Sequence, residues 1–235
     1  MDGSAINAVK ELAQQASGLQ EIEGRKYSYG TLKLVERPLP TALRLQTLSG
    51  LVDYVEGNKD GLKPENLIIV AGNHKQVGLL GANEPDTQNR PNYASAELAD
   101  VEVFPFDEFL DFETFMIKLL CLFQTGPELD AFIAKVFKVK VVDEEEHSDD
   151  GVSTTKTTKE SVISEARREV VELKPFRTFQ ELDQPKSKFI FRISRTRGEL
   201  SMALFECAGG AWVNDARQSI KAYFAKKLPD VTVLA

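Results

Sequence analysis

The basic side chains that follow Gln184 are the residues whose type and spacing most favour a chemical role. They alternate with Phe189 and Phe191 at the period of two that is typical of a half-buried β-strand. Basic groups beside aromatic rings can bind single-stranded nucleic acid, because the rings stack on bases while the cations contact phosphates. The same alternation also fits a strand whose phenylalanines face the core. The candidate nucleic-acid contacts are Lys186, Lys188, Arg192, Arg195 and Arg197.

The acidic run at residues 143–150 is the candidate for a cation site, because hard cations prefer oxygen ligands. The run lacks the spacing of an EF-hand, so we interpret it as a solvated loop. The sequence contains no motif typical of a nucleophile elbow, a zinc protease, a redox dithiol or a phosphate loop. We therefore expect no catalytic residue, no metal, no cofactor and no enzymatic activity.

The two cysteines and two histidines give no catalytic pattern. Cys121 and Cys207 lie in apolar runs, which predicts buried and reduced thiols. His74 lies in a predicted hairpin turn, where we expect it to be exposed to solvent. His147 lies inside the acidic run, so neither histidine is placed by the sequence to activate a cysteine.

The elements that carry the basic residues are a predicted β-hairpin and the helix after it. Strands are predicted at residues 188–194 and 200–207, and a helix at 211–228, whose apolar residues recur at helical spacing. The chain must reverse direction between strand and helix within about three residues, which favours positive φ at the two glycines there. The predicted anchor of hairpin and helix consists of Phe205, Gly209, Gly210, Trp212 and Phe224.

The segment KPFRTFQELDQPKSKFIFRI, followed by ALFECAGGAW, resembles the YfdQ-like proteins of phages and prophages. The resemblance spans roughly residues 141–235 and extends more loosely over the whole chain. It implies a phage-encoded protein in the cytoplasm of a bacterial host cell. It carries over no catalytic residue, because the molecular function of that family is unassigned.

The phenylalanines divide the chain into two predicted parts. All 14 occur at or after Phe104, so residues 1–103 are expected to form a lighter N-terminal layer and residues 104–235 a Phe-rich main core. Acidic residues account for the net charge of −7, which is unlike that of a protein that coats duplex DNA. No apolar run reaches the ~18 residues of a membrane span.

The remaining elements predict an α+β fold with a mainly antiparallel mixed sheet. A helical hairpin is expected at residues 106–137, where the stripe of the first helix either packs in the core or forms a seam between protomers. That stripe is Phe109, Phe112, Met116, Leu119 and Phe123. Further helices are predicted at 5–16 and from Thr47 or Ser49 to 56, and further strands at 28–35, 42–48, 67–71, 76–80, 93–104, 139–142 and 231–234.

These features predict a non-enzymatic phage or prophage accessory protein that acts through homo-oligomeric assembly and macromolecular contacts. One alternative is a single-stranded nucleic-acid-binding protein of a phage recombination or replication module. Another is an antagonist of a host defence system, which follows from the phage context rather than from any residue. The expected partners are the chain itself, then single-stranded nucleic acid or a host protein, and no membrane.

Overall fold

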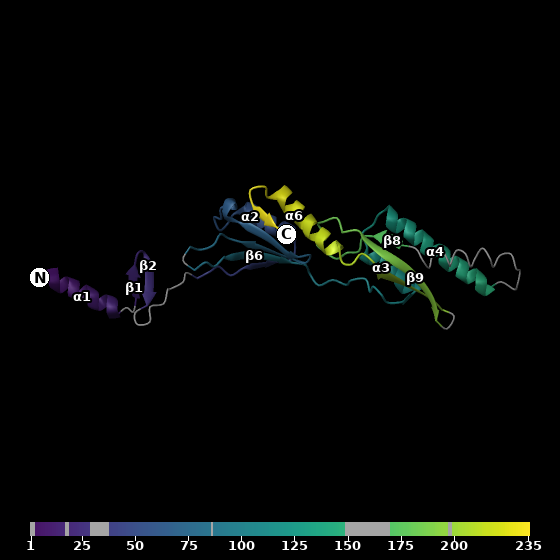
Figure 1. Cartoon of the computed structure of the whole chain (residues 1–235), viewed down its shortest axis with the longest axis horizontal. Coiled ribbons are helices and arrows are strands. Elements are labelled where there is room, and N and C mark those ends of the chain that lie inside the picture. Colours follow the sequence, from purple (N-terminus) through teal and green to yellow (C-terminus); the bar gives the residue numbers. More distant parts are fainter. Residues whose placement is uncertain (1–2, 17–18, 29–37, 86, 149–169, 197–198) are drawn as a thin grey trace. The chain divides into compact units, whose positions relative to one another are not determined.

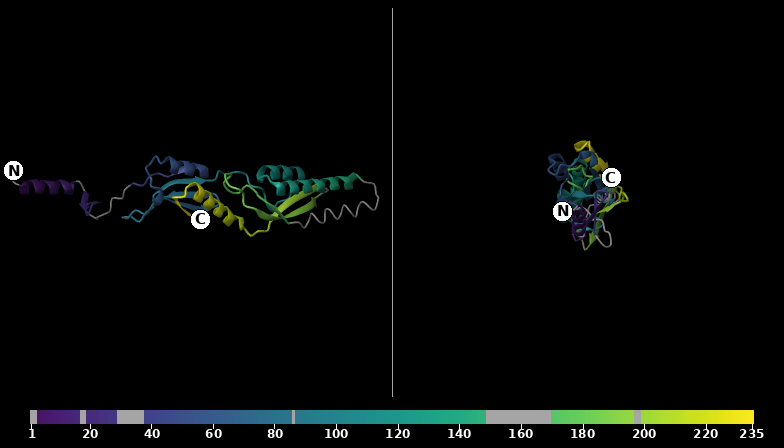
Figure 2. Two further views of the ribbon diagram at one scale, coloured as in Figure 1. Left: turned by 90° about the horizontal axis from the view of Figure 1, so that it is seen from above. Right: turned by 90° about the vertical axis from the view of Figure 1, so that its left-hand side faces the viewer.

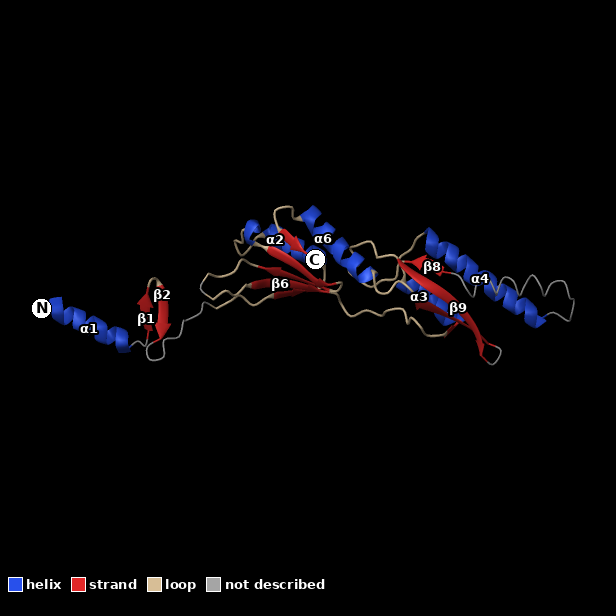
Figure 3. Ribbon diagram, viewed as in Figure 1, coloured by secondary structure: helices blue, strands red, loops and turns tan. Residues whose placement is uncertain are grey.

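A computed structural model describes residues 3–16, 19–28, 38–85, 87–148, 170–196 and 199–235. The fold is α+β with mostly antiparallel sheets, as predicted (Figure 3). The chain divides into two compact units. One comprises Met1–Thr41 with Asn83–Pro91, and the other comprises Ala42–Ala82 with Asn92–Ala235.

The first unit contains a helix and a small hairpin. Helix α1 (Gly3–Ala16) confirms the predicted N-terminal helix. Strands β1 (Leu19–Ile22) and β2 (Arg25–Ser28) pair antiparallel across a turn in which Glu23 and Gly24 both have positive φ. The predicted strand at 28–35 falls almost entirely outside the described residues.

The second unit contains two sheets, each with helices on one face. The first sheet has the order β11-β4-β5-β6-β3, in which β4, β5 and β6 are antiparallel neighbours while β11 and β3 pair parallel at the edges. Its helices are α2 (Leu48–Gly57) and α6 (Trp212–Lys227), with a short 3-10 turn at Pro64–Asn66 (Figure 1). The strands are β3 (Leu43–Leu45), β4 (Ile68–Asn73), β5 (Gln76–Leu80), β6 (Asn92–Glu97) and β11 (Thr232–Leu234).

Alternate residues of the first sheet form its core. Ile69, Val77 and Ala94 face the helices and are fully buried, and Leu51 of α2 and Phe224 of α6 pack against them. This is the burial expected of a sheet with one covered face. The core confirms the predicted hairpin of β4 and β5, whereas β6 ends at Glu97 instead of reaching Phe104.

Helix α2 ends where its capping residues predict. The side chain of Thr47 accepts a hydrogen bond from the Gly50 N–H (3.2 Å), and Asn58 closes the helix in the left-handed conformation. A second cap comes from far along the chain, because the Glu181 carboxylate accepts hydrogen bonds from the Leu48 N–H (3.1 Å) and the Ser49 N–H (2.8 Å). An anion at a helix N-terminus is favoured by the helix dipole.

The second sheet has the order β7-β10-β9-β8 and is antiparallel. Helices α3 (Phe112–Leu122) and α4 (Pro127–Ser148) pack on one of its faces (Figure 2). Its core is rich in phenylalanine, with Phe115, Phe189 and Phe191 fully buried. The strands are β7 (Leu110–Asp111), β8 (Val170–Leu173), β9 (Ser187–Thr196) and β10 (Glu199–Glu206), and β9–β10 is the predicted hairpin.

The helical hairpin differs from its prediction at both ends. Helix α3 begins at Phe112, because Asp111 caps it through the Thr114 N–H (2.9 Å) and pairs with β10 as part of β7. The predicted strand at 139–142 was wrong, because these residues are part of α4. The predicted loop at 143–150 was wrong for residues 143–148, which are also helical. Residue Val139 is buried in the core on the same side of the helix as Val136, which overrides the local alternation. Residues 149 and 150 lie outside the described part.

The two cores do not follow the division at residue 103. Helix α6 lies within the predicted Phe-rich part, yet its residues Ile220 and Phe224 belong to the core of the first sheet. Segment 173–186 contributes to both, since Leu173 enters the second core while Phe179 and Leu182 enter the first. The sheets are therefore assembled from interleaved segments.

Candidate interaction site

The segment that links the two cores is organised around a buried glutamine. The Gln184 side-chain oxygen accepts hydrogen bonds from the Arg177 N–H (3.0 Å) and the Thr178 N–H (3.2 Å). Its side-chain nitrogen donates to the carbonyls of Phe179 (3.1 Å) and Leu182 (3.3 Å). Gln184 is 1% exposed, so the N–H groups of Arg177 and Thr178 and the Leu182 carbonyl depend on it rather than on water, while the Phe179 carbonyl also accepts from the Leu182 N–H (3.2 Å).

A buried arginine stands beside this glutamine. The Arg177 guanidinium lies over the rings of Phe106 (4.4 Å) and Trp212 (4.6 Å), and its Nη1 donates to the Glu206 carboxylate at 2.9 Å. Burial lowers the pKa of Arg177, and the hydrogen bond and negative charge of Glu206 oppose that shift. The ion pair ties the linking segment to β10, and because Arg177 is only 5% exposed it is not open to a ligand.

His74 belongs to the same cluster and is not the exposed turn residue that the sequence predicts. It is partly buried, its ring packs edge-on against Trp212 at 4.8 Å, and its carbonyl accepts from the Thr178 hydroxyl (2.6 Å). Its Nδ1 is buried and has no hydrogen-bond partner among the residues that the structure describes. Burial lowers the pKa of His74, and the charges of Lys75 and Arg177 lower it further.

Acid is expected to weaken the folded state through His74. Its pKa is lowered from 6.5 in the folded chain, so below pH 6.5 the unfolded chain binds a proton that folded His74 does not yet bind. The contribution to the free energy of unfolding is complete above pH 6.5 and is lost as the pH falls toward the lowered pKa. We expect urea unfolding of His74→Gln to depend less on pH in this window than wild type, and equal slopes would contradict it.

The predicted structural anchor is only partly assembled. Gly209 (φ 59°) and Gly210 (φ 76°) have the positive φ expected of the reversal before α6. The three aromatic residues do not meet, however, because Trp212 packs on Arg177 and His74, Phe224 lies in the first core, and Phe205 packs on Phe109. The prediction that both cysteines are buried was also wrong, since Cys121 and Cys207 are exposed.

The basic residues do not form an open platform with the predicted phenylalanines. Phe189 and Phe191 face the core, while Lys188 and Arg192 are exposed on the opposite side of β9. Lys186 is engaged by Glu128 (2.8 Å) and Glu172 (3.7 Å), and Lys188 approaches Glu172 (3.9 Å). Arg195 is exposed near the end of β9, and Arg197 lies outside the described residues.

The predicted seam is mostly core. Met116, Leu119 and Phe123 are buried within the chain, so they are not available to a second protomer. Phe109 precedes α3 and is 47% exposed, and Phe112 is partly buried against Phe137. Other apolar side chains are exposed on the outer sides of the two helices, namely Ile117, Leu120, Phe137 and Val141.

Two hollows lie between the start of α4 and strand β8. One, of about 140 Å³, extends from Gln124 past Glu128 to Lys174 and Asp183. The other, of about 240 Å³, lies between α4 and β8, and the two share Glu128 and Glu172 as lining residues. Together they form a groove along β8, which we call the β8 groove. It is lined by Gln124–Leu129, Ala131, Phe132, Lys135, Val170–Lys174, Asp183 and Lys186.

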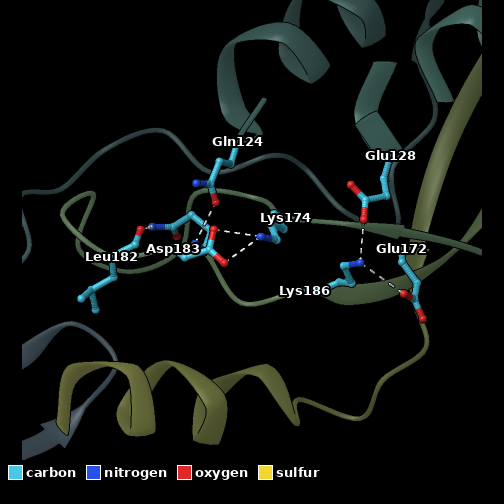
Figure 4. Close-up of polar contacts among 8 residues, drawn as sticks. Gln124, Glu128, Glu172, Lys174, Leu182, Asp183 and Lys186 are labelled. Carbon is cyan, nitrogen blue, oxygen red and sulfur yellow. Dashed lines mark hydrogen bonds and ion pairs between the residues drawn. The ribbon is translucent and has the colours of Figure 1, made fainter. Parts of the chain in front are cut away.

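Ion pairs cross one end of the β8 groove (Figure 4). Lys174 contacts both oxygens of Asp183 (2.8 and 2.7 Å), and Lys186 bridges Glu128 and Glu172. The pKa of Lys186 is raised by its hydrogen bond to Glu128 and by that residue's charge. The groove has three carboxylates and three ammonium groups among its lining residues, so it carries no formal net charge toward a ligand.

Sequence reasoning missed the residues that matter most here. Arg177 and Gln184 lie in the linking segment and Glu206 at the end of β10, and nothing local marks them as partners. A charged residue between Phe176 and Phe179, in a stretch otherwise typical of a core, was the available signal for Arg177.

Within the described residues, no three acidic, histidine or cysteine side chains lie close enough together to hold a metal ion. None of the helices in that part of the chain is both long and apolar enough to cross a membrane. Comparisons with protein-family models, with curated proteins and with solved structures find no match to this chain.

Proposed function

We propose that the protein is a non-enzymatic accessory protein that acts by homo-oligomeric assembly and by contacts with other macromolecules. The observation that carries this proposal is the exposure of large apolar side chains around the second sheet. Ile117 and Leu120 of α3 and Phe137 and Val141 of α4 are each at least half exposed. Each pair is three or four residues apart and so shares one side of its helix, and exposed apolar patches are typical of surfaces that bind another protein.

The opposite face of the second sheet supports the same proposal. Val170, Ile190 and Phe205 are adjacent across three strands, because Ile190 pairs with both Val170 and Phe205. The exposed Phe109 ring packs against Phe205 at 6.0 Å and extends this apolar row. The phage or prophage setting of the proposal rests on the sequence resemblance, as does a role against host defence.

Binding of single-stranded nucleic acid has less support. Two of the five basic candidates approach carboxylates within 4 Å, and the phenylalanines expected to stack on bases are buried. Phe109 and Phe205 offer aromatic surface near Arg192, but Glu172 and Glu199 are also exposed on this sheet. Self-association is therefore the better-supported function.

Light scattering coupled to size-exclusion chromatography tests the proposal on the full chain. We expect a mass that is a multiple of 26.2 kDa at micromolar concentration, unchanged by single-stranded DNA. A mass of one chain would contradict homo-oligomeric assembly. A mass that rises only when DNA is added would favour the nucleic-acid alternative instead.

A further inference from the structure

Strand β8 is an edge strand with an open side. It is the last strand of the second sheet and pairs with β9 alone among the described residues. Beyond Leu173, the same side of the chain is closed, since the Lys174 carbonyl accepts from the Gln124 N–H (2.8 Å) and the Phe176 N–H donates to the Leu122 carbonyl (2.9 Å). An open edge is a template for pairing with another strand.

The hydrogen bonds on either side determine which backbone groups of β8 are open. Neighbouring residues of a strand direct their N–H and C=O groups to opposite sides. The Lys188 carbonyl accepts from Cys207 on the β10 side, so Phe189 directs its groups toward Val171 of β8. Val171 therefore bonds to β9, whereas Val170 and Glu172 direct their backbone groups to the open edge. The outward carbonyl of Lys174 agrees with this alternation.

The open edge is self-complementary. A two-fold axis perpendicular to the sheet, midway between the Val171 residues of two copies, places β8 antiparallel to the β8 of the second copy. Val170 then lies opposite Glu172 of the other chain on both sides of the axis. Each such pair can exchange two N–H···O=C hydrogen bonds, because these are the residues whose groups are open.

The same axis also makes one side of helix α4 complementary to that side of α4 in the second copy. Glu128, Ala131 and Lys135 are spaced by three and four residues, so they share one side of α4, and all three line the β8 groove beside Val171. The axis makes α4 antiparallel to α4 of the second copy and brings Glu128 opposite Lys135. The small side chain of Ala131 at the centre allows the helices to approach. The balanced charges of the groove also suit a copy of itself better than a polyanion.

We infer that the chain forms a two-fold dimer in which β8 pairs with β8 and α4 packs against α4, so that the second sheet continues across the interface. The inference rests on the proposed homo-oligomeric function and names the β8 edge and α4 as a surface through which two copies associate. The interface is isologous and closed, as in most soluble homo-oligomers. It fills the β8 groove in both copies.

Proline at position 172 tests the strand pairing. Glu172→Pro removes an N–H from the open edge without removing a hydrogen bond to β9, and proline is tolerated at such edge positions. We expect the light-scattering mass to fall from twice 26.2 kDa to 26.2 kDa, with the circular dichroism spectrum unchanged. The matched control Glu172→Gln loses the same carboxylate but keeps the N–H, so it should remain dimeric.

Charge reversal tests the helix pairing independently. Glu128→Lys and Lys135→Glu each place like charges across the axis and should raise the dissociation constant about tenfold. The double variant restores opposite charges across the axis and should recover most of the affinity, although the Glu128–Lys186 ion pair within each chain stays lost. A monomeric wild type would overturn both this inference and the proposed function. An oligomer that resists Glu172→Pro, or that the double reversal fails to restore, would overturn the inference and leave the proposed function standing.

Discussion

Glu206→Ala is expected to lower the free energy of unfolding by about 3 kcal/mol, because it leaves the Arg177 charge buried without a partner. Arg177 is 5% exposed, and Glu206 is the carboxylate that its Nη1 contacts at 2.9 Å. Urea unfolding followed by fluorescence measures the effect. The single tryptophan, Trp212, lies 4.6 Å from the guanidinium and reports on this cluster directly.

Asp183→Ala is the matched control, because it also removes a carboxylate from an ion pair. The Asp183 side chain is 69% exposed, and the pair that it forms with Lys174 lies in solvent. The loss should be below about 1 kcal/mol. Equal losses in the two variants would show that burial does not distinguish the Arg177 pair, and would contradict its role in tying the linking segment to β10.

Gln184→Leu is expected to cost about 4 kcal/mol, although leucine is similar in size and more apolar. The substitution leaves the N–H groups of Arg177 and Thr178 and the Leu182 carbonyl without their partner, whereas the Phe179 carbonyl keeps the Leu182 N–H. An unsatisfied buried polar group costs roughly 1–3 kcal/mol, and some of the three will recover water as the segment relaxes.

Gln180→Leu supplies the comparison within the same segment. Gln180 is exposed, so its replacement should change the free energy of unfolding by less than about 0.5 kcal/mol. The measurement is the urea midpoint of each variant, compared on the condition that the dependence of the unfolding free energy on urea concentration is the same in both. If Gln184→Leu were as stable as Gln180→Leu, the buried amide would not organise the link between the cores.

Local patterns predicted the elements whose stabilising contacts are themselves local. The period of two in β9, the capping residue Thr47 and the glycines before α6 all act within a few residues, and each is found where the sequence indicates. Helix α4 was predicted too short because residues 138–142 alternate like a strand. The burial of Val136 and Val139 in the Phe-rich core decides their conformation instead.

The candidate site was less predictable, because its contacts join distant segments. Arg177 meets Glu206 and Trp212, and the Glu181 carboxylate reaches α2 more than a hundred residues earlier in the chain. The β8 groove likewise depends on two elements separated by residues outside the described part. Charge and periodicity located basic residues correctly on the exposed side of β9 without revealing their carboxylate partners.

The distant origin of the α2 cap and of helix α6 bears on folding during synthesis. The strands β4, β5 and β6 leave the ribosome early, but Glu181 is made only after β8, and α6 and β11 only after the whole second sheet has been translated. Until then the apolar face of Ile69, Val77 and Leu79 lacks the side chains of Ile220 and Phe224 that cover it in the folded chain. Closing such long loops slows folding and prolongs exposure of apolar surface. The nascent chain therefore passes through a stage at which the second sheet can form before the first is complete. During that stage the apolar face of the first sheet is a surface that chaperones can bind.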